Sequence, residues 1–361
     1  MAEAADFACM AEALRLAERG LYTTTPNPRV GCVIVNGGEV VGVGWHERAG
    51  GPHAEIVALA QAGSRARGAT LYLTLEPCSH QGRTPPCAEK VVAAGVARVV
   101  AAMQDTDPRV AGRGFERLRA AGIALETGVL EAQARALNAG FIARTTRGTP
   151  WLRLKAAASL DGRTALANGV SQWITGEAAR RDGHAWRARS CAVLTGIGTV
   201  KDDDPRLTVR HVETSRQPLK VVVDSRLETP PSARLLDEGH VLIAAAREDR
   251  TAMAALEERG AEVVVLPNAQ GKVDLPALMR ELARRGINEV LAEAGTKLNG
   301  SLIREGVVDE LLLYLAPCLL GDTAAGIAAL PELESLDGRR RLAIRDLRIV
   351  GEDLRLLAAL V

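Results

Sequence analysis

The sequence predicts an α/β protein with two domains, and three observations lead to this fold class. The chain has 361 residues, a length that corresponds to about two domains of ordinary size. Apolar residues make up 47% and charged residues 25% of it, as in an average globular protein, which excludes a disordered or collagen-like chain. Short apolar runs typical of strands alternate with segments of helical periodicity in both halves.

The first half contains a helix, a hairpin, and then alternating helices and strands. Apolar residues recur with helical spacing over residues 3–19, and Gly20 ends this helix. The apolar run 30–35 predicts a strand, and Asn36-Gly37-Gly38 predicts a hairpin turn into a second strand at 39–45. The other elements that the pattern predicts are helices at 54–61, 87–94, 114–121 and 130–138 and strands at 69–75 and 98–103.

A polar segment separates the two predicted domains. Residues 141–150, FIARTTRGTP, contain Gly148 and Pro150 and predict a linker. We therefore expect one domain at 1–146 and a second at 147–361. The second domain is predicted to contain strands at 151–158, 191–195, 219–224, 240–246, 261–265, 288–293 and 309–316, helices at 176–189, 249–259, 275–285 and 297–305, and paired strands over 341–361.

Charge and hydropathy argue against several classes of partner. The chain carries 45 basic and 44 acidic residues and only 3% aromatic residues, whereas proteins that bind nucleic acids usually show a basic excess or aromatic stacking platforms. No window approaches the ~18 apolar residues that a membrane-spanning helix needs, and the charged N-terminus does not resemble a signal or transit peptide. We expect a cytoplasmic protein that acts on a small molecule and binds neither nucleic acid nor membrane.

Six cysteines are too few for a disulfide scaffold, but two of them stand out. Cys78 and Cys87 flank the polar loop SHQGRTPP, so burial as small hydrophobic residues does not account for them. The other four lie among apolar or small residues and are expected to be buried: Cys9, Cys32, Cys191 and Cys318.

His53, Cys78 and Cys87 form a candidate zinc site. His53 opens a predicted helix, Cys78 follows a strand through Glu76 and Pro77, and Cys87 begins another helix. One imidazole and two thiolates suit Zn²⁺ and leave a fourth position open for water, as in catalytic zinc sites. The dipole at the start of a helix favours a thiolate there. We therefore predict one zinc ion bound by these three side chains.

Glu55, two residues after His53, is the candidate catalytic residue. On a helix the two side chains would point about 200° apart, so the site must lie beside the first turn, where both can reach it. A glutamate there can carry a proton from zinc-bound water to a leaving amine, and zinc deaminases share the pattern H-x-E…P-C-x-x-C. This chain has eight residues between its two cysteines instead of two. The residues alone leave two alternatives open, a structural zinc site with His80 as fourth ligand and a cluster without metal.

Three motifs resemble the family of bifunctional deaminase/reductase proteins of riboflavin biosynthesis. They are TPNPRVG at 25–31, HAE at 53–55 and EPCSHQGRTPPC at 76–87, and the long cysteine spacing belongs to that family's pattern. The resemblance implies an N-terminal cytidine-deaminase-like α/β/α domain and a C-terminal dihydrofolate-reductase-like α/β domain. It also implies zinc-dependent hydrolytic deamination of 2,5-diamino-6-ribosylamino-4(3H)-pyrimidinone 5′-phosphate, followed by NADPH-dependent reduction of the ribosyl side chain to ribityl.

The same resemblance assigns roles to residues of the first domain. Asn27 would fix the edge of the pyrimidine. His80 and Arg83, between the two cysteines, would hold the ribosyl phosphate, which needs cationic and donor-rich partners; solvated loop residues are the alternative. The segment 105–108, DTDP, departs from the D-P-N-P expected there, so a substrate contact that needs an asparagine is not carried over to Asp107.

The second half lacks the Gly-x-Gly-x-x-Gly sequence of a Rossmann domain after its first strand. Polar clusters follow predicted strands at 159–163, 199–205 and 293–296, and open α/β sheets bind ligands at such strand ends. In the last cluster the strand leads through Gly295 into a helix, whose first N–H groups suit a pyrophosphate. An ordinary β–α turn is the alternative.

Further motifs resemble the reductase domain of the same family, among them KAAASLDG at 155–162, SQWIT at 171–175 and VDS at 223–225. The resemblance implies that NADPH contacts Ala157, Trp173, Thr199, Asp203, Ser225 and the turn formed by Gly295, Thr296, Lys297, Leu298, Asn299, Gly300 and Ser301. It implies that the substrate contacts Ser171, Arg187, Leu207, Arg210 and Glu293. Arg187 and Arg210 would clamp the 5′-phosphate, with ordinary surface positions as the alternative.

Two other classes of function stay open on the residues alone. One is a deaminase that edits nucleic acids, which the neutral net charge and the reductase motifs disfavour. The other is a zinc-stabilised binding module without catalysis, which would use four protein ligands and give Glu55 no role. The sequence does not determine the oligomeric state, and a homo-oligomer is one option.

Overall fold

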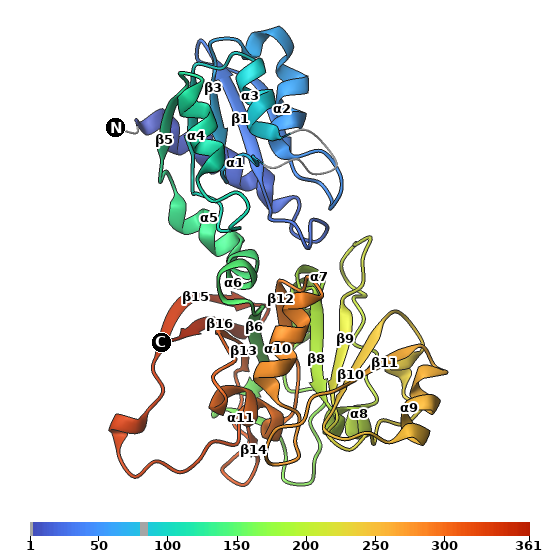
Figure 1. Ribbon diagram of the computed structural model, residues 1–361. Coiled ribbons are helices and arrows are strands. Elements are labelled where there is room, and N and C mark those ends of the chain that lie inside the picture. The colour runs from blue at the N-terminus through green and yellow to red at the C-terminus, as the bar shows by residue number, and fades with distance from the viewer. Residues whose placement is uncertain (1–2, 80–85) are drawn as a thin grey trace. The chain divides into compact units, whose positions relative to one another are not determined.

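The computed structural model describes residues 3–79 and 86–361, and the chain forms two compact units, Met1–Gly148 and Thr149–Val361 (Figure 1). His80 and Arg83 lie outside the described residues. Within the described ranges, no helix is long and apolar enough to cross a membrane. Each unit contains its own main sheet.

The first unit is built on a five-stranded sheet in the order β2-β1-β3-β4-β5. β1 (Gly31–Asn36) pairs antiparallel with β2 (Glu39–Trp45), as the predicted hairpin requires, and also with β3 (Thr70–Leu73). β3, β4 (Arg98–Ala101) and β5 (Ala124–Thr127) are parallel. The carboxyl ends of β3 and β4 therefore lie at the same edge of the sheet.

Helices cover both faces of this sheet, which gives three layers. A Cβ on Gly31 would lie 1.9 Å from the carbonyl oxygen of Ala13, and one on Gly44 would lie 2.3 Å from that of Ala54, so neither position accepts a larger residue. Gly31 pairs with Trp45, the neighbour of Gly44, so the two glycines face opposite sides. The helices of this unit are α1 (Ala4–Glu18), α2 (Ala54–Ala62), α3 (Cys87–Ala93), α4 (Arg113–Ala120), α5 (Glu131–Leu137) and α6 (Ala139–Arg147), with a short 3-10 helix at Gly63–Ala66.

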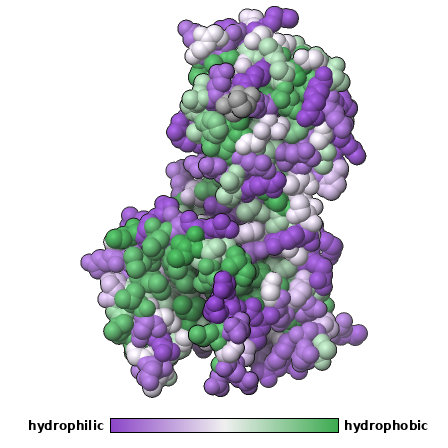
Figure 2. All heavy atoms as spheres, turned by 90° about the vertical axis from the view of Figure 1, so that its left-hand side faces the viewer, coloured by the Kyte–Doolittle hydropathy of each residue, from purple (hydrophilic) through white to green (hydrophobic). Residues whose placement is uncertain are grey.

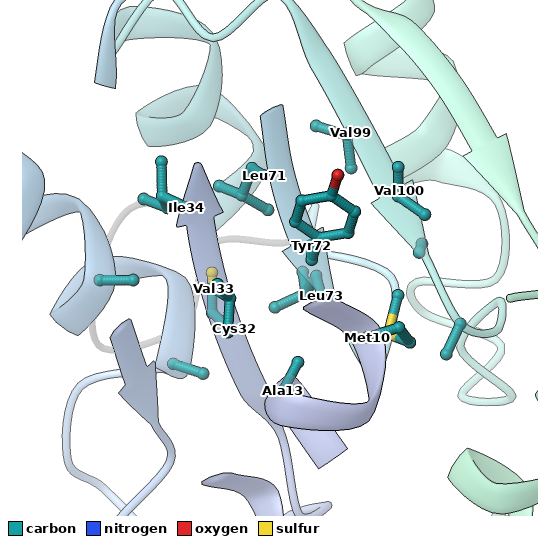
Figure 3. Packing of buried hydrophobic residues seen from close by; sticks show 14 of the residues in the cluster. Met10, Ala13, Cys32, Val33, Ile34, Leu71, Tyr72, Leu73, Val99 and Val100 are labelled. Carbon is teal, nitrogen blue, oxygen red and sulfur yellow. The ribbon is translucent and has the colours of Figure 1, made fainter. Parts of the chain in front are cut away.

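The core of the first unit follows the alternation of side chains along its strands (Figure 3). Val33, Tyr72 and Val100 are register partners across β1, β3 and β4, and they lie on the side of the sheet that α1 covers with Met10. Cys32 points to the other face and is buried, as predicted. The central strands therefore carry apolar residues on both faces, as a doubly covered sheet requires.

Residues 141–150 do not form the predicted linker, because α6 occupies most of this segment. The prediction gave weight to its polar residues, but Phe141 is buried and the Thr145 hydroxyl donates to the Phe141 carbonyl inside the helix. Gly148, with φ of 70°, ends the helix in a left-handed conformation. The predicted boundary between residues 146 and 147 thus falls inside α6, whereas the two compact units divide after Gly148.

The second unit is built on a nine-stranded sheet in the order β11-β10-β9-β8-β12-β6-β13-β16-β15. The strands from β11 to β13 in this order are all parallel to one another. β16 pairs antiparallel with β13, and β15 pairs antiparallel with β16. Their bounds are β6 (Trp151–Ser159), β8 (Ala192–Gly196), β9 (Leu219–Val223), β10 (Val241–Ala245), β11 (Ala261–Val265), β12 (Glu289–Ala292), β13 (Glu310–Ala316), β15 (Leu342–Val350) and β16 (Asp353–Leu360).

The remaining elements of the second unit are short or connect the strands. They are β7 (Arg163–Ala165), which pairs with β14 (Ala325–Gly326), the helices α7 (Glu177–Arg189), α8 (Ile197–Asp203), α9 (Arg250–Glu257), α10 (Leu275–Arg284) and α11 (Thr296–Arg304), and 3-10 helices at Arg234–Leu236 and Leu336–Gly338. The prediction that Cys318 is buried is wrong, because the chain has left β13 there and the side chain is exposed. The parallel strands place the segments after β6, β8, β9 and β12 at one edge of the sheet.

Candidate functional site

The side chains of His53, Cys78 and Cys87 converge in the first unit. Their candidate ligand atoms all lie within 4.8 Å of one another. His53 Nδ1 lies 3.1 Å from Cys87 Sγ and 3.7 Å from Cys78 Sγ. Zinc binds such atoms at about 2.0–2.3 Å, so tetrahedral ligands stand roughly 3.5 Å apart. The donor set and its spacing therefore fit a zinc ion.

Three different chain segments bring these ligands together. His53 is the extended residue that precedes α2, with φ of −75° and ψ of 160°. Cys78 follows β3, and Cys87 is the first residue of α3. The N–H of Cys87 donates to Cys78 Sγ at 3.3 Å, and the N–H of Ala88 donates to the Cys78 carbonyl at 3.1 Å. The start of α3 thus binds directly to the segment that carries the other thiol.

The two thiols differ in protonation. A hydrogen bond from Cys87 lowers the pKa of Cys78 to about 4, against the effect of burial, and His53 adds to this lowering. The pKa of Cys87 is raised, because its thiol donates to Cys78 and because it is buried. The hydrogen bond to Cys78 likewise raises the pKa of His53. A divalent cation would displace the protons that these three groups share.

Glu55 lies beside the ligands in the first turn of α2. It is 2% exposed, and burial is the main reason why its pKa is raised. Its carboxylate is within hydrogen-bonding reach of the Cys87 thiol. The structure therefore places Glu55 next to the three converging side chains, beside the first turn of the helix.

Asn27 is held by a histidine that the sequence analysis missed. The Asn27 amide lies 3.0 Å from His46 Nε2, and His46 Nδ1 lies 2.9 Å from the Pro52 carbonyl. Because a carbonyl only accepts, His46 donates from Nδ1 and accepts from the Asn27 amide nitrogen at Nε2. Burial lowers the pKa of His46, which favours this neutral form. A single histidine after a strand gave no sequence signal for this arrangement.

Asp107, the residue that departs from the family pattern, is bound within its own loop. Its carboxylate accepts from Arg109 Nη2 at 2.6 Å and from the Arg109 backbone N–H at 2.9 Å. An asparagine could not form this ion pair. The replacement is thus accompanied by a cation two residues away, which balances the additional charge.

In the second unit, two of the predicted substrate residues bind each other. Arg187 of α7 donates to Glu293 through Nε at 2.5 Å and through Nη2 at 3.0 Å, and its Nη1 donates to the Thr208 carbonyl. Lys155 Nζ lies 3.5 Å from the same carboxylate. Burial alone would raise the pKa of Glu293, but Arg187 and Lys155 outweigh it and hold that pKa below its usual range. Arg187 thus directs two donor atoms to Glu293 and a third to Thr208.

Arg210 is exposed and lies near other cations. Its Nη1 donates to the Thr208 hydroxyl at 3.2 Å, and its backbone N–H donates to His184 Nδ1 at 3.2 Å. Burial and the nearby Arg187 lower its pKa. Of the other predicted substrate residues, Ser171 is half-buried and Leu207 is buried with φ of 55°.

The predicted cofactor residues lie mainly at the carboxyl edge of the sheet. Thr199 Oγ1 lies 3.9 Å from where a Cβ on Gly295 would be, so α8 and the start of α11 are neighbours. Ala157 is half-buried on β6, and the Ser225 hydroxyl accepts from the Val273 N–H at 3.2 Å. Thr199 and Gly295 therefore lie close together, as the prediction requires. The Ser225 hydroxyl, in contrast, already binds a backbone N–H of the protein.

The segment Gly295–Ser301 has both exposed and inward-facing members. Lys297 is exposed and Leu298 half-buried. Thr296 and Asn299 donate to the carbonyls of Gly326 and Ile327, and a Cβ on Gly300 would lie 2.1 Å from the Ala329 carbonyl. These contacts fix the start of α11 against the segment 326–329.

Trp173 and Asp203 lie at the surface. The Trp173 ring is 70% exposed, and the Arg180 guanidinium lies 4.6 Å from its centre. Asp203, at the end of α8, accepts from Gln172 Nε2 at 3.5 Å. Both side chains are open to a ligand, and Trp173 does not belong to the core.

Two family models match the two units. The cytidine and deoxycytidylate deaminase zinc-binding region matches residues 4–103, and the RibD C-terminal domain matches residues 150–355. Riboflavin biosynthesis protein RibD of Escherichia coli is 48% identical over 358 residues, which cover 96% of each chain. The chain belongs to the RibD family. It is therefore an enzyme of riboflavin biosynthesis with a deaminase domain and a reductase domain.

Solved structures agree with this family over the whole chain. Acinetobacter baumannii RibD has a TM-score of 0.91 at 42% identity and covers 99% of both chains. A Thermotoga maritima diaminohydroxyphosphoribosylaminopyrimidine deaminase/5-amino-6-(5-phosphoribosylamino)uracil reductase has a TM-score of 0.87 at 30% identity, again over 99% of both. The predicted fold class, a deaminase-like α/β domain followed by a reductase-like α/β domain, is confirmed. The deaminase cluster fits zinc, and the reductase domain implies a nicotinamide cofactor.

Proposed function

We propose that the first unit deaminates 2,5-diamino-6-ribosylamino-4(3H)-pyrimidinone 5′-phosphate, with one zinc ion per chain. The second unit then reduces the ribosyl side chain of the product, 5-amino-6-(5-phosphoribosylamino)uracil, with NADPH. The Thermotoga maritima relative is named for both reactions. The observation that carries the proposal is the convergence of His53, Cys78 and Cys87 beside the buried carboxylate of Glu55.

In the deaminase unit, the chain would supply three ligands and one proton carrier. Bound zinc lowers the pKa of a water molecule to near 7 and so supplies a nucleophile at neutral pH. Glu55, which touches the ligand set, takes a proton from the attacking water and delivers it to the amino nitrogen that leaves as ammonia. The amide nitrogen of Asn27 donates to His46, and this bond fixes the orientation of the amide group. The Asn27 Oδ1 is then left to accept from an N–H of the pyrimidine.

In the reductase unit, NADPH supplies a hydride when it is bound. The N–H groups at the start of α11, after Gly295, are suited to its pyrophosphate, and the neighbouring Thr199 borders the same region. We assign the predicted cofactor and substrate residues to this site as a whole. Within it, Arg187 holds Glu293 in one orientation, while the more exposed Arg210 is available to the 5′-phosphate.

The test is to incubate the purified, zinc-loaded chain with the diaminopyrimidinone phosphate and to identify the products by mass spectrometry. Without NADPH we expect ammonia and the uracil product, and with NADPH we expect the ribityl product. Failure to release ammonia would contradict the deaminase assignment. Failure to reduce separately supplied uracil would contradict the reductase assignment independently.

The finer assignment of Arg210 can be tested with a dephosphorylated substrate. Charge-assisted bonds contribute ~1.5–3 kcal/mol, so Arg210→Ala should raise the reductase KM by roughly 10–100-fold. The variant should discriminate much less than the native chain between phosphorylated and dephosphorylated substrates. Additive losses in this double-mutant cycle would show that Arg210 does not touch the phosphate.

We also propose that the chain forms a homo-oligomer through an apolar face of the second unit. Figure 2 shows a broad apolar area on the side of this unit where β15 and β16 lie in Figure 1. Leu342, Ile344, Leu347 and Ile349 of β15 are 44–73% exposed. A β-bulge at Arg345 interrupts the alternation, so that all four oppose even-numbered residues of β16 and share one face.

A second copy of the chain is the occupant that fits this face best. With the half-buried Leu354 and Leu356 beside them, the four side chains offer an apolar area on the order of several hundred Å². That is a substantial part of the ~800 Å² that each partner contributes to a standard interface. The same apolar patch on both copies is self-complementary, as a twofold interface requires.

Sedimentation velocity tests this interface. We expect the native chain to sediment as a dimer or larger assembly and Ile349→Glu to shift it toward monomer. Val40→Glu is the matched control, because Val40 is equally an exposed apolar residue on a strand but belongs to the first unit. A monomeric native chain at micromolar concentration would contradict the proposal. The cytoplasmic location and the absence of a nucleic-acid partner stay predictions from composition.

A further inference from the structure

We propose that Glu76 is a positioning residue that sets the places of both cysteine ligands. The inference rests on the proposed zinc site. Glu76 itself contacts none of the three ligand side chains in the described contacts; it is joined to Cys78 through Pro77. Its role is therefore to hold the chain that carries the ligands.

The Glu76 carboxylate is the meeting point of four backbone N–H groups. The side chain is buried, with 3% exposure. Oε2 accepts from Asp105 at 3.1 Å and Gly112 at 2.9 Å, and Oε1 accepts from Gly114 at 2.8 Å and Phe115 at 3.2 Å. A carboxylate can accept from all four donors, whereas an amide would turn its own N–H groups toward two of them.

These bonds connect two elements that follow neighbouring parallel strands. Glu76 follows β3, and its backbone N–H donates to the Met103 carbonyl after β4. Its side chain binds the loop that follows β4 and the first turn of α4. The exit of β3 is thus fixed to the exit of β4 by both backbone and side chain.

Pro77 transmits this fixed position to Cys78. Proline restricts its own φ and keeps the preceding residue extended, so the link between the carboxylate and the thiol has little freedom. A Cβ on Gly114 would lie 2.1 Å from the Pro77 carbonyl, so α4 also packs directly on this link. The position of Cys78 therefore depends on the contact between Glu76 and α4.

The position of Cys87 depends on Cys78 in turn. The Cys87 and Ala88 N–H groups at the start of α3 donate to the thiol and the carbonyl of Cys78. A displacement of Cys78 would move α3 or break these bonds. One buried carboxylate thus controls the geometry of two of the three ligands.

Asp6 provides a matched control for Glu76. Its carboxylate is also buried, with 2% exposure. It also accepts four hydrogen bonds, two from Arg98 and one each from the Tyr72 hydroxyl and the Glu3 N–H. Asp6 belongs to α1, which covers the face of the sheet opposite to α2. Asp6→Asn removes the same kind of group from the same unit without touching the segment of Cys78.

The experiment measures metal binding by the full chain after its zinc has been removed. Zn²⁺ affinity is determined by competition with a chromogenic chelator, and Co²⁺ is added separately to record the sulfur-to-metal charge-transfer spectrum. We expect Glu76→Gln to weaken Zn²⁺ binding by about 10–100-fold, as for other residues that orient metal ligands, and to change the Co²⁺ spectrum. Asp6→Asn should keep both properties, even if it lowers the melting temperature.

The outcomes separate this inference from a general loss of stability. Native affinity and a native Co²⁺ spectrum in Glu76→Gln would overturn it, and so would an equal loss in Asp6→Asn. If Glu76→Gln does not fold, Glu76→Asp carries the test with the same expected direction, because it keeps the charge but is too short to reach both pairs of donors. A native chain that binds neither metal would overturn the proposed zinc site itself.

Discussion

The two units hold their buried ionisable groups in different ways. In the first unit, His53, Cys78 and Cys87 bind one another, and Glu55 borders them. In the second unit, Glu293 is paired with Arg187 and Lys155. The first cluster consists of groups that a metal cation binds, whereas the second already contains both signs of charge. The two candidate sites therefore differ: the cluster in the deaminase unit fits an added metal ion, while the Glu293 cluster of the reductase unit is paired by the protein's own cations.

The second unit repeats this arrangement away from its candidate site. Arg153 is buried between Glu289 and Glu310, and Arg189 binds Glu289 at 2.9 Å. Removing one member of a buried pair leaves its partner charged and unpaired, which is costly. The reductase unit should therefore be sensitive to substitutions of these arginines, and the deaminase unit to removal of the proposed zinc ion.

The largest expected effect separates the two units by activity. Glu55→Gln keeps the size of the side chain but removes its titrating group, so ammonia release should fall by ~10²–10⁴-fold. Zinc content should stay near that of the native chain, and the reduction of separately supplied uracil product should be unchanged. Loss of zinc in this variant would show that Glu55 is a ligand and not a proton carrier.

A second expected effect tests charge pairing in the reductase unit. Arg187→Gln leaves the Glu293 carboxylate with Lys155 alone, so unfolding in denaturant should show a loss of about 3–5 kcal/mol. Arg181→Gln is the control, because the pair of Arg181 and Glu177 on the same helix is exposed and contributes about 0.3–0.5 kcal/mol. If both variants lose the same free energy of unfolding, the pair of Arg187 and Glu293 contributes no more to stability than an exposed pair.

Removal of zinc should act on the first unit alone. At free zinc 100-fold above the dissociation constant, binding stabilises the folded unit by about 2.7 kcal/mol. Hydrogen exchange measured by mass spectrometry should therefore become faster in peptides of β1 and β3 after chelation and stay the same in β8 and β12. Faster exchange in both units would show that zinc also stabilises the second unit.

The pH dependence of the second unit should show the influence of His184. Burial, together with Arg187, Arg210 and His211, lowers the pKa of His184 to about 4, although Glu293 opposes this. As the pH falls, His184 therefore takes up a proton in the unfolded chain before it does so in the folded chain. This favours the unfolded chain, so the free energy of unfolding decreases as the pH falls from about 6.5 toward 4. We expect a loss on the order of 2 kcal/mol at pH 5. His184→Gln should flatten this part of the stability profile, and an unchanged profile would exclude His184 as its source.

The smallest expected effect compares two glycines in helices. Gly183 of α7 has open space where a Cβ would be, so Gly183→Ala should stabilise the second unit by about 0.5–1 kcal/mol. Gly114 of α4 would place a Cβ 2.1 Å from the Pro77 carbonyl, so Gly114→Ala should destabilise the first unit. Thermal unfolding measures both, and a gain in stability at Gly114 would mean that α4 does not press on Pro77.

The sequence predicted the elements with strong periodicity and missed those that tertiary contacts stabilise. The strand at 39–45 and the hairpin before it agree with β2 and its turn, because both are determined by local residues. The polar composition of residues 141–150 predicts a linker, whereas the helix α6 forms there with Phe141 buried against the protein. β5 was missed because its four residues gain their strand conformation by pairing with β4.

The candidate sites show the same division. His53, Cys78 and Cys87 carry their chemistry in their residue types and lie at helix starts and a strand end, so the sequence predicts that they meet although the cysteine spacing departs from the zinc-deaminase pattern. The pairing of Arg187 with Glu293 joins residues 106 positions apart, and the contact of Asn27 with His46 depends on how β2 ends. Neither contact is encoded by a local pattern, so each could be found only in the folded chain.

The bulge at Arg345 has a consequence for how this chain can change by deletion. In β15, one additional residue keeps Leu342 and Ile344 on the same face as Leu347 and Ile349. Loss of the single codon for residue 345 would restore regular alternation and leave all four side chains on one face, because Arg345 is the residue without a register partner on β16. With residue 345 present the apolar face depends on the bulge, since pairing Arg345 into a regular ladder would turn Leu342 and Ile344 to the opposite face of the sheet.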